Sequence, residues 1–362
     1  MGIPECIIEF KKRAKDFRFR SEQNVVALVL KDTTSAVKGK SLSYSDFREV
    51  KESDFTADNY DFIRLAFLGE PMKVIVEVID DFEEAPGGRN LDAVLKQLEL
   101  RKFNYLAIPE LPKAKTTVVE SWITEVRKKY KPFKAVLSGT TAKNEKGLIN
   151  FVTEKIQVKD KTYTALQYTA RIAGVLAGIP STQSGTYAVL DEVNDIELTE
   201  DESAAVDEGK LILTNDGEKV KIVRAVTALT QVENNDIDSF KKIKIVDTAD
   251  RIMADIKETW DNNFVGKVMN IYPNKLHFLN AVKGYYNFLQ KEGVLDPNAE
   301  ASSDIDIEEQ IKYLKKVQVD VSKLTEQEVK EYNTSTFLFS KSNITIADAM
   351  EDLTFTLYLA NE

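Results

Sequence analysis

Cysteine and histidine are nearly absent from the sequence, which has one of each among 362 residues. The single cysteine, Cys6, excludes an intramolecular disulfide and any metal site built from several cysteines. The single histidine, His277, excludes histidine-rich metal sites and leaves one imidazole for acid–base chemistry. Because His277 lies among Leu276, Phe278 and Leu279, we expect a structural or exposed side chain rather than a catalytic one. We therefore expect no metal and no cofactor.

Long apolar runs are also missing. The longest are VVALVL (25–30) and IAGVLAGI (172–179), and neither approaches the roughly 20 residues that a membrane-spanning helix needs. The charged N-terminal stretch is not followed by the apolar segment of a signal peptide. These features predict a soluble protein that is made in a cytoplasm and does not insert into membranes.

The nucleotide-binding and hydrolase motifs are absent as well. The chain has no GxGxxG after a predicted strand, no GxxxxGK[ST] and no GxSxG. The glycine-rich PGGRN (86–90) follows the acidic DDFEEA rather than a strand, so we interpret it as a loop. A Ser-His-Asp triad would have to use His277. We predict no catalytic residues, and the alternative that stays open is an α/β nucleotide- or substrate-binding enzyme of an unmatched type.

Charge is distributed unevenly along the chain. The net charge of −10 makes free nucleic acid an unexpected partner. Residues 11–20, KKRAKDFRFR, carry six basic groups and one acid, whereas residues 191–209 carry nine acids and no base. Each run is either a solvated face of the molecule or one of two complementary surfaces that meet between copies.

The first half of the chain alternates between strand and helix patterns, which predicts a parallel sheet with helices on its faces. Residues 33–53 are polar and indicate a loop or short hairpin. The strand patterns cover residues 24–32, 73–79, 103–110, 133–139 and 148–152, and the helix patterns cover 56–69, 90–102, 115–130 and 162–178.

The pattern changes near residue 180. A hairpin with an Asp216-Gly217 turn is predicted at 210–226, two longer helices at 240–260 and 274–292, and short strands at 336–340 and 344–348. Alternating apolar residues at both ends of the chain predict two lone strands that need partners: Cys6, Ile8 and Phe10 at the start, and Phe355, Leu357 and Leu359 at the end.

Four long segments have a specific and ordered pattern. They are RIAGVLAGIPSTQSGTYAVLDEV (171–193), SFKKIKIVDTADRIMADIKETW (239–260), VGKVMNIYPNKLHFLNAVKGYYNFLQKEGVLD (265–296) and EYNTSTFLFSKSNITIADAMEDLTF (331–355). Together they resemble the contractile tail sheath family, in the branch of Gram-positive myophages, defective prophages and R-type bacteriocins. The resemblance covers nearly the whole chain and is weakest at residues 33–60.

The resemblance implies a subunit that stacks as hexameric rings around a tail tube and contracts. Its expected partners are further copies of itself, the tail tube protein, and baseplate and tail-terminator proteins. The implied fold is an α/β, subtilisin-like core domain without catalytic residues, plus a C-terminal α+β domain that faces the tube. The corresponding divisions are an N-terminal arm at 1–20, the core at 21–232, the tube-facing domain at 233–345 and a C-terminal arm at 346–362.

The resemblance also implies roles for particular residues. The arms would add strands to neighbouring subunits through Cys6, Ile8, Phe10, Phe355, Leu357 and Leu359. A short helix would touch the tube, and LTEQEVKEY (324–332) has the right pattern, with Thr325 as N-cap and Glu328 at the capping-box position. Glu326, Glu328 and Glu331 would then face basic groups of the tube; the alternative is an ordinary surface helix.

Overall fold

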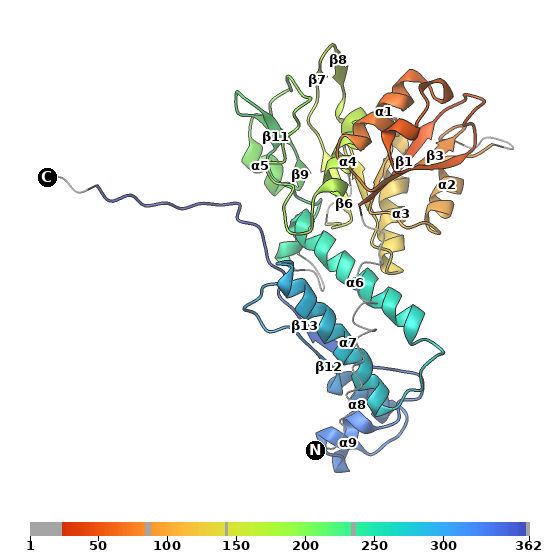
Figure 1. The fold of residues 1–362 in the computed structure, drawn as a ribbon, viewed down its shortest axis with the longest axis vertical. Helices are drawn as coiled ribbons and strands as arrows, with labels where there is room; N and C mark the ends of the chain where they lie inside the picture. The colour runs from red at the N-terminus through yellow and green to blue at the C-terminus, as the bar shows by residue number, and fades with distance from the viewer. Residues whose placement is uncertain (1–23, 84–87, 142–143, 233–236, 360–362) are drawn as a thin grey trace, which may run out of the picture. The chain divides into compact units, whose positions relative to one another are not determined.

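A computed structural model describes residues 24–83, 88–141, 144–232 and 237–359 of the chain (Figure 1). It contains two compact units. One comprises residues 24–251 and 348–359, and the other comprises residues 252–347. The division after residue 251 falls within a helix, and the chain returns to the first unit at residue 348. The expected mixture of α and β structure is confirmed.

The larger unit, here called the sheet unit, is built on seven strands in the order β2-β3-β1-β4-β5-β6-β9. Every neighbouring pair is parallel except β2, which is antiparallel to β3 at one edge. The strands are β1 (Val25–Lys31), β2 (Ser41–Tyr44), β3 (Lys73–Ile79), β4 (Tyr105–Ala107), β5 (Lys134–Leu137), β6 (Leu148–Phe151) and β9 (Lys210–Leu211).

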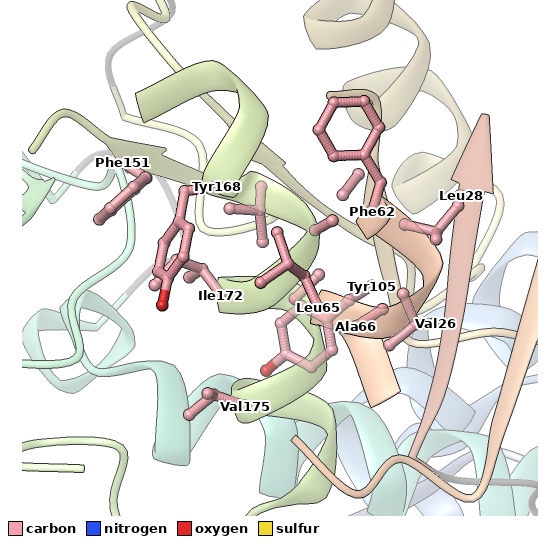
Figure 2. Close-up of a cluster of buried hydrophobic side chains, with 14 of the residues drawn as sticks. Val26, Leu28, Phe62, Leu65, Ala66, Tyr105, Phe151, Tyr168, Ile172 and Val175 are labelled. Carbon is pink, nitrogen blue, oxygen red and sulfur yellow. The ribbon is translucent and has the colours of Figure 1, made fainter. Parts of the chain in front are cut away.

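Helices cover both faces of this sheet. On one face lie α1 (Ala57–Phe67) and α4 (Ala165–Gly178), and on the other lie α2 (Leu91–Leu98) and α3 (Thr116–Lys128). Successive residues of β1 alternate between the two cores, because side chains of a strand point to opposite faces. Figure 2 shows the α1–α4 core, where Leu65 and Ile172 meet side chains from the sheet.

Helices α1 and α4 approach each other so closely that glycine is required where they meet. A Cβ added at Gly174 would lie 2.1 Å from the carbonyl oxygen of Ala66, and one at Gly178 would lie 1.7 Å from the oxygen of Gly69. Both distances are far below van der Waals contact. The glycines of the IAGVLAG pattern are therefore explained by backbone packing.

Smaller elements complete the sheet unit. The predicted hairpin forms with its turn at Asp216 and Gly217, where Gly217 has a φ of 94° that favours glycine. The elements are β7 (Ile156–Val158), β8 (Lys161–Tyr163), α5 (Glu202–Asp207), β10 (Leu213–Asn215), β11 (Val220–Ile222) and the 3-10 turns η1 (Phe47–Glu49), η2 (Glu52–Asp54), η3 (Lys113–Lys115) and η4 (Asp238–Lys241).

The unit of residues 252–347 packs around aromatic side chains. The ring of Phe278 meets those of Trp260 and Phe264 edge-on, each at 5.0 Å between centroids. Its elements are the second half of α6 (Ile243–Asn263), α7 (Tyr272–Lys291), β12 (Ser302–Ile305), α8 (Ile307–Lys316), η5 (Val321–Lys323), α9 (Glu326–Glu331) and β13 (Ser340–Asn343), which pairs antiparallel with β12.

Three features differ from the sequence-based expectations. The contacts group residues 237–251 with the sheet unit, so the compact units separate after Arg251, whereas the domain division at 232/233 stays a prediction. Residues 33–53 contain the edge strand β2, which pairs with β3 rather than with a local hairpin partner. The strands expected at 336–340 and 344–348 do not form within those bounds, since β13 begins only at Ser340 and residues 344–348 contribute a single bridge between Leu295 and Ile346.

Candidate functional site

Open parallel sheets bind ligands at the carboxyl ends of their strands, where the chain switches direction across the sheet. Here that point lies between β1 and β4, and Asp32 directly follows β1. The Asp32 carboxylate accepts hydrogen bonds from the backbone N–H groups of Thr34 (2.8 Å) and Thr56 (2.9 Å) and from the Asn59 amide (2.9 Å). Burial alone would raise the pKa of Asp32, but these hydrogen bonds lower it overall. Through these hydrogen bonds, Asp32 connects the loop after β1 to the first turn of α1.

A second carboxylate at the same edge has a similar structural use. Glu120 on α3 accepts hydrogen bonds from the backbone N–H of Thr141 (2.8 Å), the Thr141 hydroxyl (3.2 Å) and the Thr140 hydroxyl. The pKa of Glu110, which follows β4, is raised. Burial is the largest cause, and the charge of Asp58 adds to it. The edge therefore offers a protonatable carboxyl at Glu110 among groups that stabilise loops.

A small cavity lies at the opposite, amino-terminal edge of the sheet. It has a volume of about 50 Å³ and is lined by Asn24, Asn104, Tyr105 and Asp247, among others. Pockets for small-molecule ligands typically measure about 300–1,000 Å³. This cavity therefore has room for water rather than for a substrate.

Beside this cavity lies a buried charge network that the sequence did not reveal. The Lys134 ammonium on β5 lies 2.9 Å from the Asp247 carboxylate and 3.2 Å from that of Asp250, both on α6. Arg127 on α3 pairs with Asp250, and the Tyr105 hydroxyl donates to Asp247 at 2.5 Å. Burial would raise the pKa of Asp250, but the charges of Lys134 and Arg127 outweigh it and lower the pKa. The network ties the start of α6 to the sheet.

The described residues contain no cluster of His, Cys, Asp or Glu side chains suited to a metal ion. His277 is exposed on α7, and its ring centroid lies 6.0 Å from that of Phe264. None of the helices described is long and apolar enough to cross a membrane.

The C-terminal segment exposes its apolar side chains. Phe355, Leu357 and Leu359 are 75%, 67% and 80% exposed, and the described residues provide no strand that pairs with them. Figure 1 shows this segment as an extended chain. The corresponding N-terminal residues Cys6, Ile8 and Phe10 lie outside the described residues.

Helix α9 forms where the sequence predicts it, with the capping box of Thr325 and Glu328. The three glutamates expected to face a tube all have partners within this chain. Glu326 pairs with Lys330 at 3.2 Å, Glu328 accepts the Thr325 backbone N–H at 2.8 Å, and Glu331 accepts from Gln327 at 2.6 Å. Because Glu328 is committed to the cap, Glu326 and Glu331 are the carboxylates better placed for an outside partner.

Two family models match this chain. The phage tail sheath protein central domain matches residues 84–228, and the phage tail sheath C-terminal domain matches residues 236–360. A tail sheath protein of Clostridium phage phiCD119 is 37% identical over 363 residues, which cover 97% of this chain and 98% of that protein. The chain belongs to the phage tail sheath protein family.

Solved sheath structures share the fold of this tail sheath protein. A sheath tail protein from Desulfitobacterium hafniense matches with a TM-score of 0.68 at 16% identity, covering 84% of this chain and 94% of that one. One from Listeria innocua matches at 0.66 and 16% identity, covering 94% and 99%. The anti-feeding prophage sheath in its contracted state matches at 0.67 and 13% identity, covering 99% of both chains.

Proposed function

We propose that this sheath subunit polymerises as stacked hexameric rings around a tail tube and that the assembly contracts to drive the tube through the envelope of a target cell. The observation that carries this proposal is the exposure of Phe355, Leu357 and Leu359 within their own subunit. Apolar side chains on an extended segment gain free energy when another surface covers them. An arm that adds a strand to a neighbouring copy provides such a surface.

The energetics favour arms that act collectively. Burying each of the three apolar side chains contributes about 1.5–3 kcal/mol, and each added hydrogen bond contributes about 0.5–1.5 kcal/mol. Ordering the backbone costs about 1–2 kcal/mol for each residue. These contributions nearly cancel for a single arm, so one arm binds weakly. Many arms in one lattice hold each other at high effective concentration.

The two-stranded sheet of β12 and β13 is the acceptor that we propose for an arm. All four residues of β13 (Ser340–Asn343) are exposed, and an isolated two-stranded sheet is only marginally stable in water. An unpaired strand edge is a ready template for another chain. The N-terminal arm with Cys6, Ile8 and Phe10 would use an equivalent edge.

The core would then be a subtilisin-like α/β scaffold that has no catalytic role. The loop-holding hydrogen bonds of Asp32 and Glu120 support this proposal, since a catalytic carboxylate needs an oxygen free for substrate. The alternative, an α/β enzyme of an unmatched type, would depend on Glu110. Glu110→Gln should leave assembly and contraction unchanged if the core is a scaffold.

The remaining partners follow from the same proposal. Helix α9 would contact the tube through Glu326 and Glu331, with Glu328 holding the helix cap. Baseplate and tail-terminator proteins would bind the two ends of the sheath. Assembly would take place in the bacterial cytoplasm, and the product would be a phage tail or a headless, tail-like particle.

Electron microscopy tests the proposal directly. Full-length protein expressed with its tube should form tubes of stacked rings, and a map that resolves strands should place residues 353–359 beside β13 of another subunit. A chain ending at residue 352 should fold and stay unassembled. Discrete particles from the full-length chain, or normal contractile tubes from the shortened one, would contradict the proposal.

A further inference from the structure

The segment that precedes the exposed arm is held firmly by the sheet unit. Three acidic residues lie on it, and each meets a polar or basic partner. Asp348 lies 2.5 Å from the Lys242 ammonium, and Asp352 lies 2.5 Å from the Arg224 guanidinium. The Ser184 hydroxyl donates a hydrogen bond to Glu351 at 2.7 Å. Ser184 lies in the loop after α4, Arg224 follows β11, and Lys242 directly precedes α6. The contact is therefore a tertiary one.

Glu351 is the centre of this contact. Its side chain is only 5% exposed, although both flanking residues face solvent. Its second carboxylate oxygen has no hydrogen-bond partner among the described residues and lies 3.9 Å from Arg224 and 4.0 Å from Lys242. A buried carboxylate needs charges or hydrogen bonds to compensate for its lost hydration. Here one oxygen accepts the Ser184 hydrogen bond, and the two basic groups compensate the other by charge alone.

The loop that carries Ser184 also has a hydrogen bond of its own. The Ser184 hydroxyl accepts the backbone N–H of Thr186 at 3.1 Å. Burial lowers the pKa of the neighbouring Lys244, and the charges of Asp348 and Glu351 act in the opposite direction. The acidic segment therefore also compensates a buried lysine at the start of α6.

We infer that Asp348, Glu351 and Asp352 form an ionic clasp that fixes the point and direction at which the C-terminal arm leaves its own subunit. This inference rests on the proposed donation of the arm to a neighbour. The arm then begins at Leu353, which is 87% exposed, and bending during contraction is concentrated there rather than at Ala347. The clasp makes arms of all subunits leave at the same angle, which a regular lattice requires.

Spin labels on the free subunit test the clasp without assembly. Met350 and Tyr358 are both almost fully exposed, at 103% and 90%, but only Met350 lies between clasp residues. A nitroxide on Met350→Cys, in a Cys6→Ser background, should tumble several-fold more slowly than one on Tyr358→Cys. Glu351→Gln combined with Asp352→Asn should abolish the difference. The inference would be overturned if the two labels were equally mobile in the protein with an intact clasp. It would also be overturned if the label at 350 stayed slow in the Glu351→Gln, Asp352→Asn variant.

Charge reversal distinguishes the loss of a specific ion pair from a general loss of structure. Arg224→Glu should free the label at 350, and adding Asp352→Arg should restore its slow tumbling. Asp261→Asn is the matched control, because Asp261 pairs with Lys257 on the exposed surface of α6. The control should leave the label at 350 slow. Release by the control, or failure of the reversed pair to restore slow tumbling, would contradict a specific ion pair.

Assembly then distinguishes this inference from the proposed function. Clasp variants keep Phe355, Leu357 and Leu359, so they should assemble with reduced yield and give sheaths that break on contraction, whereas removal of residues 353–362 should abolish assembly. Wild-type tubes from clasp variants that release the label would overturn the clasp's role and leave arm donation standing. Wild-type tubes from the shortened chain would overturn arm donation itself.

Discussion

Arg127 and Asp250 are joined by two parallel hydrogen bonds, Nη1 to Oδ2 and Nη2 to Oδ1, each 2.9 Å long. The pair links α3 to α6 across the sheet unit. Their side chains are 11% and 9% exposed, so water compensates little if one partner is lost. Lys134 approaches the same carboxylate. The attachment of α6 to the sheet thus depends on a compact group of charges.

Asp250→Asn should lower the free energy of unfolding by about 3–5 kcal/mol, because it leaves Arg127 and Lys134 buried without full compensation. Urea denaturation followed by circular dichroism measures the change. Asp261→Asn, which removes an exposed carboxylate on the same helix, should cost less than about 1 kcal/mol. Equal losses in the two variants would show that the buried group is unimportant.

Stability should fall as the pH drops below the ordinary carboxyl range. Burial would raise the pKa of Glu192, but the Arg171 charge and hydrogen bonds from Arg171 and Tyr168 lower it below 4.5 in the folded state. A lowered pKa means that the stabilisation is present above about pH 4.5 and is lost as protons bind at lower pH. Denaturation at pH 7, 5, 4 and 3 measures this loss, and Glu192→Gln should make it shallower. A slope unchanged by the substitution would contradict the assignment.

Gly174→Ala should destabilise the sheet unit by about 3 kcal/mol, because its Cβ would collide with the Ala66 carbonyl of α1 and force the helices apart. Gly284→Ala is a matched control within α7, since nothing lies within 4 Å of the added atom there. The control should gain about 0.5–1 kcal/mol from helix propensity. Thermal unfolding of both variants checks the prediction, and a neutral Gly174→Ala would show that the crossing adjusts easily.

Leu357→Asp should leave a folded monomer that fails to form sheath, because it places a charge on the side of the arm that we expect to be buried. Thr356→Asp introduces the same charge on the opposite side of the extended segment, and it should assemble. Sedimentation of particles expressed with the tube distinguishes the two. Equal assembly of both variants would show that the arm does not pair through this side.

The double variant Glu326→Lys, Glu331→Lys should assemble poorly on its tube or contract early, since it reverses the charge that α9 presents. Exposed ion pairs contribute only about 0–1 kcal/mol each, so the effect arises from repetition along the sheath. Glu308→Lys with Glu309→Lys on α8 is the control and should behave as wild type. Normal extended particles from the α9 variant would remove this helix from the tube contact.

Local patterns in the sequence predicted the regular elements of the sheet unit well. The apolar run 25–30, the helix pattern that begins at residue 90 and the Asp216-Gly217 turn all act over a few residues, and each is confirmed. The pattern at 352–359 predicted a strand, but a strand needs a partner, and the described residues of one subunit provide none. The acidic residues of 191–209 do not all have the same environment, since Glu192 is half-buried beside Arg171.

The long-range polar contacts within the chain could not be predicted from the sequence. Lys134 and Asp250 are 116 residues apart, and Ser184 and Glu351 are 167 apart. Neither pair lies in a motif, and an acidic residue near a chain end has many possible basic partners. Only the fold selects among them. The short helix α9 was predicted correctly from its capping box, whereas its contact with a tube stays a prediction. The sequence did not reveal that Glu326, Glu328 and Glu331 all have partners within the chain.

Residues 252–347 interrupt a unit whose two parts, 24–251 and 348–359, belong together. In topological terms this segment is an insertion between the two parts of the sheet unit. Residues 348–359 follow the insertion in the chain, so the sheet unit cannot acquire its last contacts during synthesis until the inserted segment has been made.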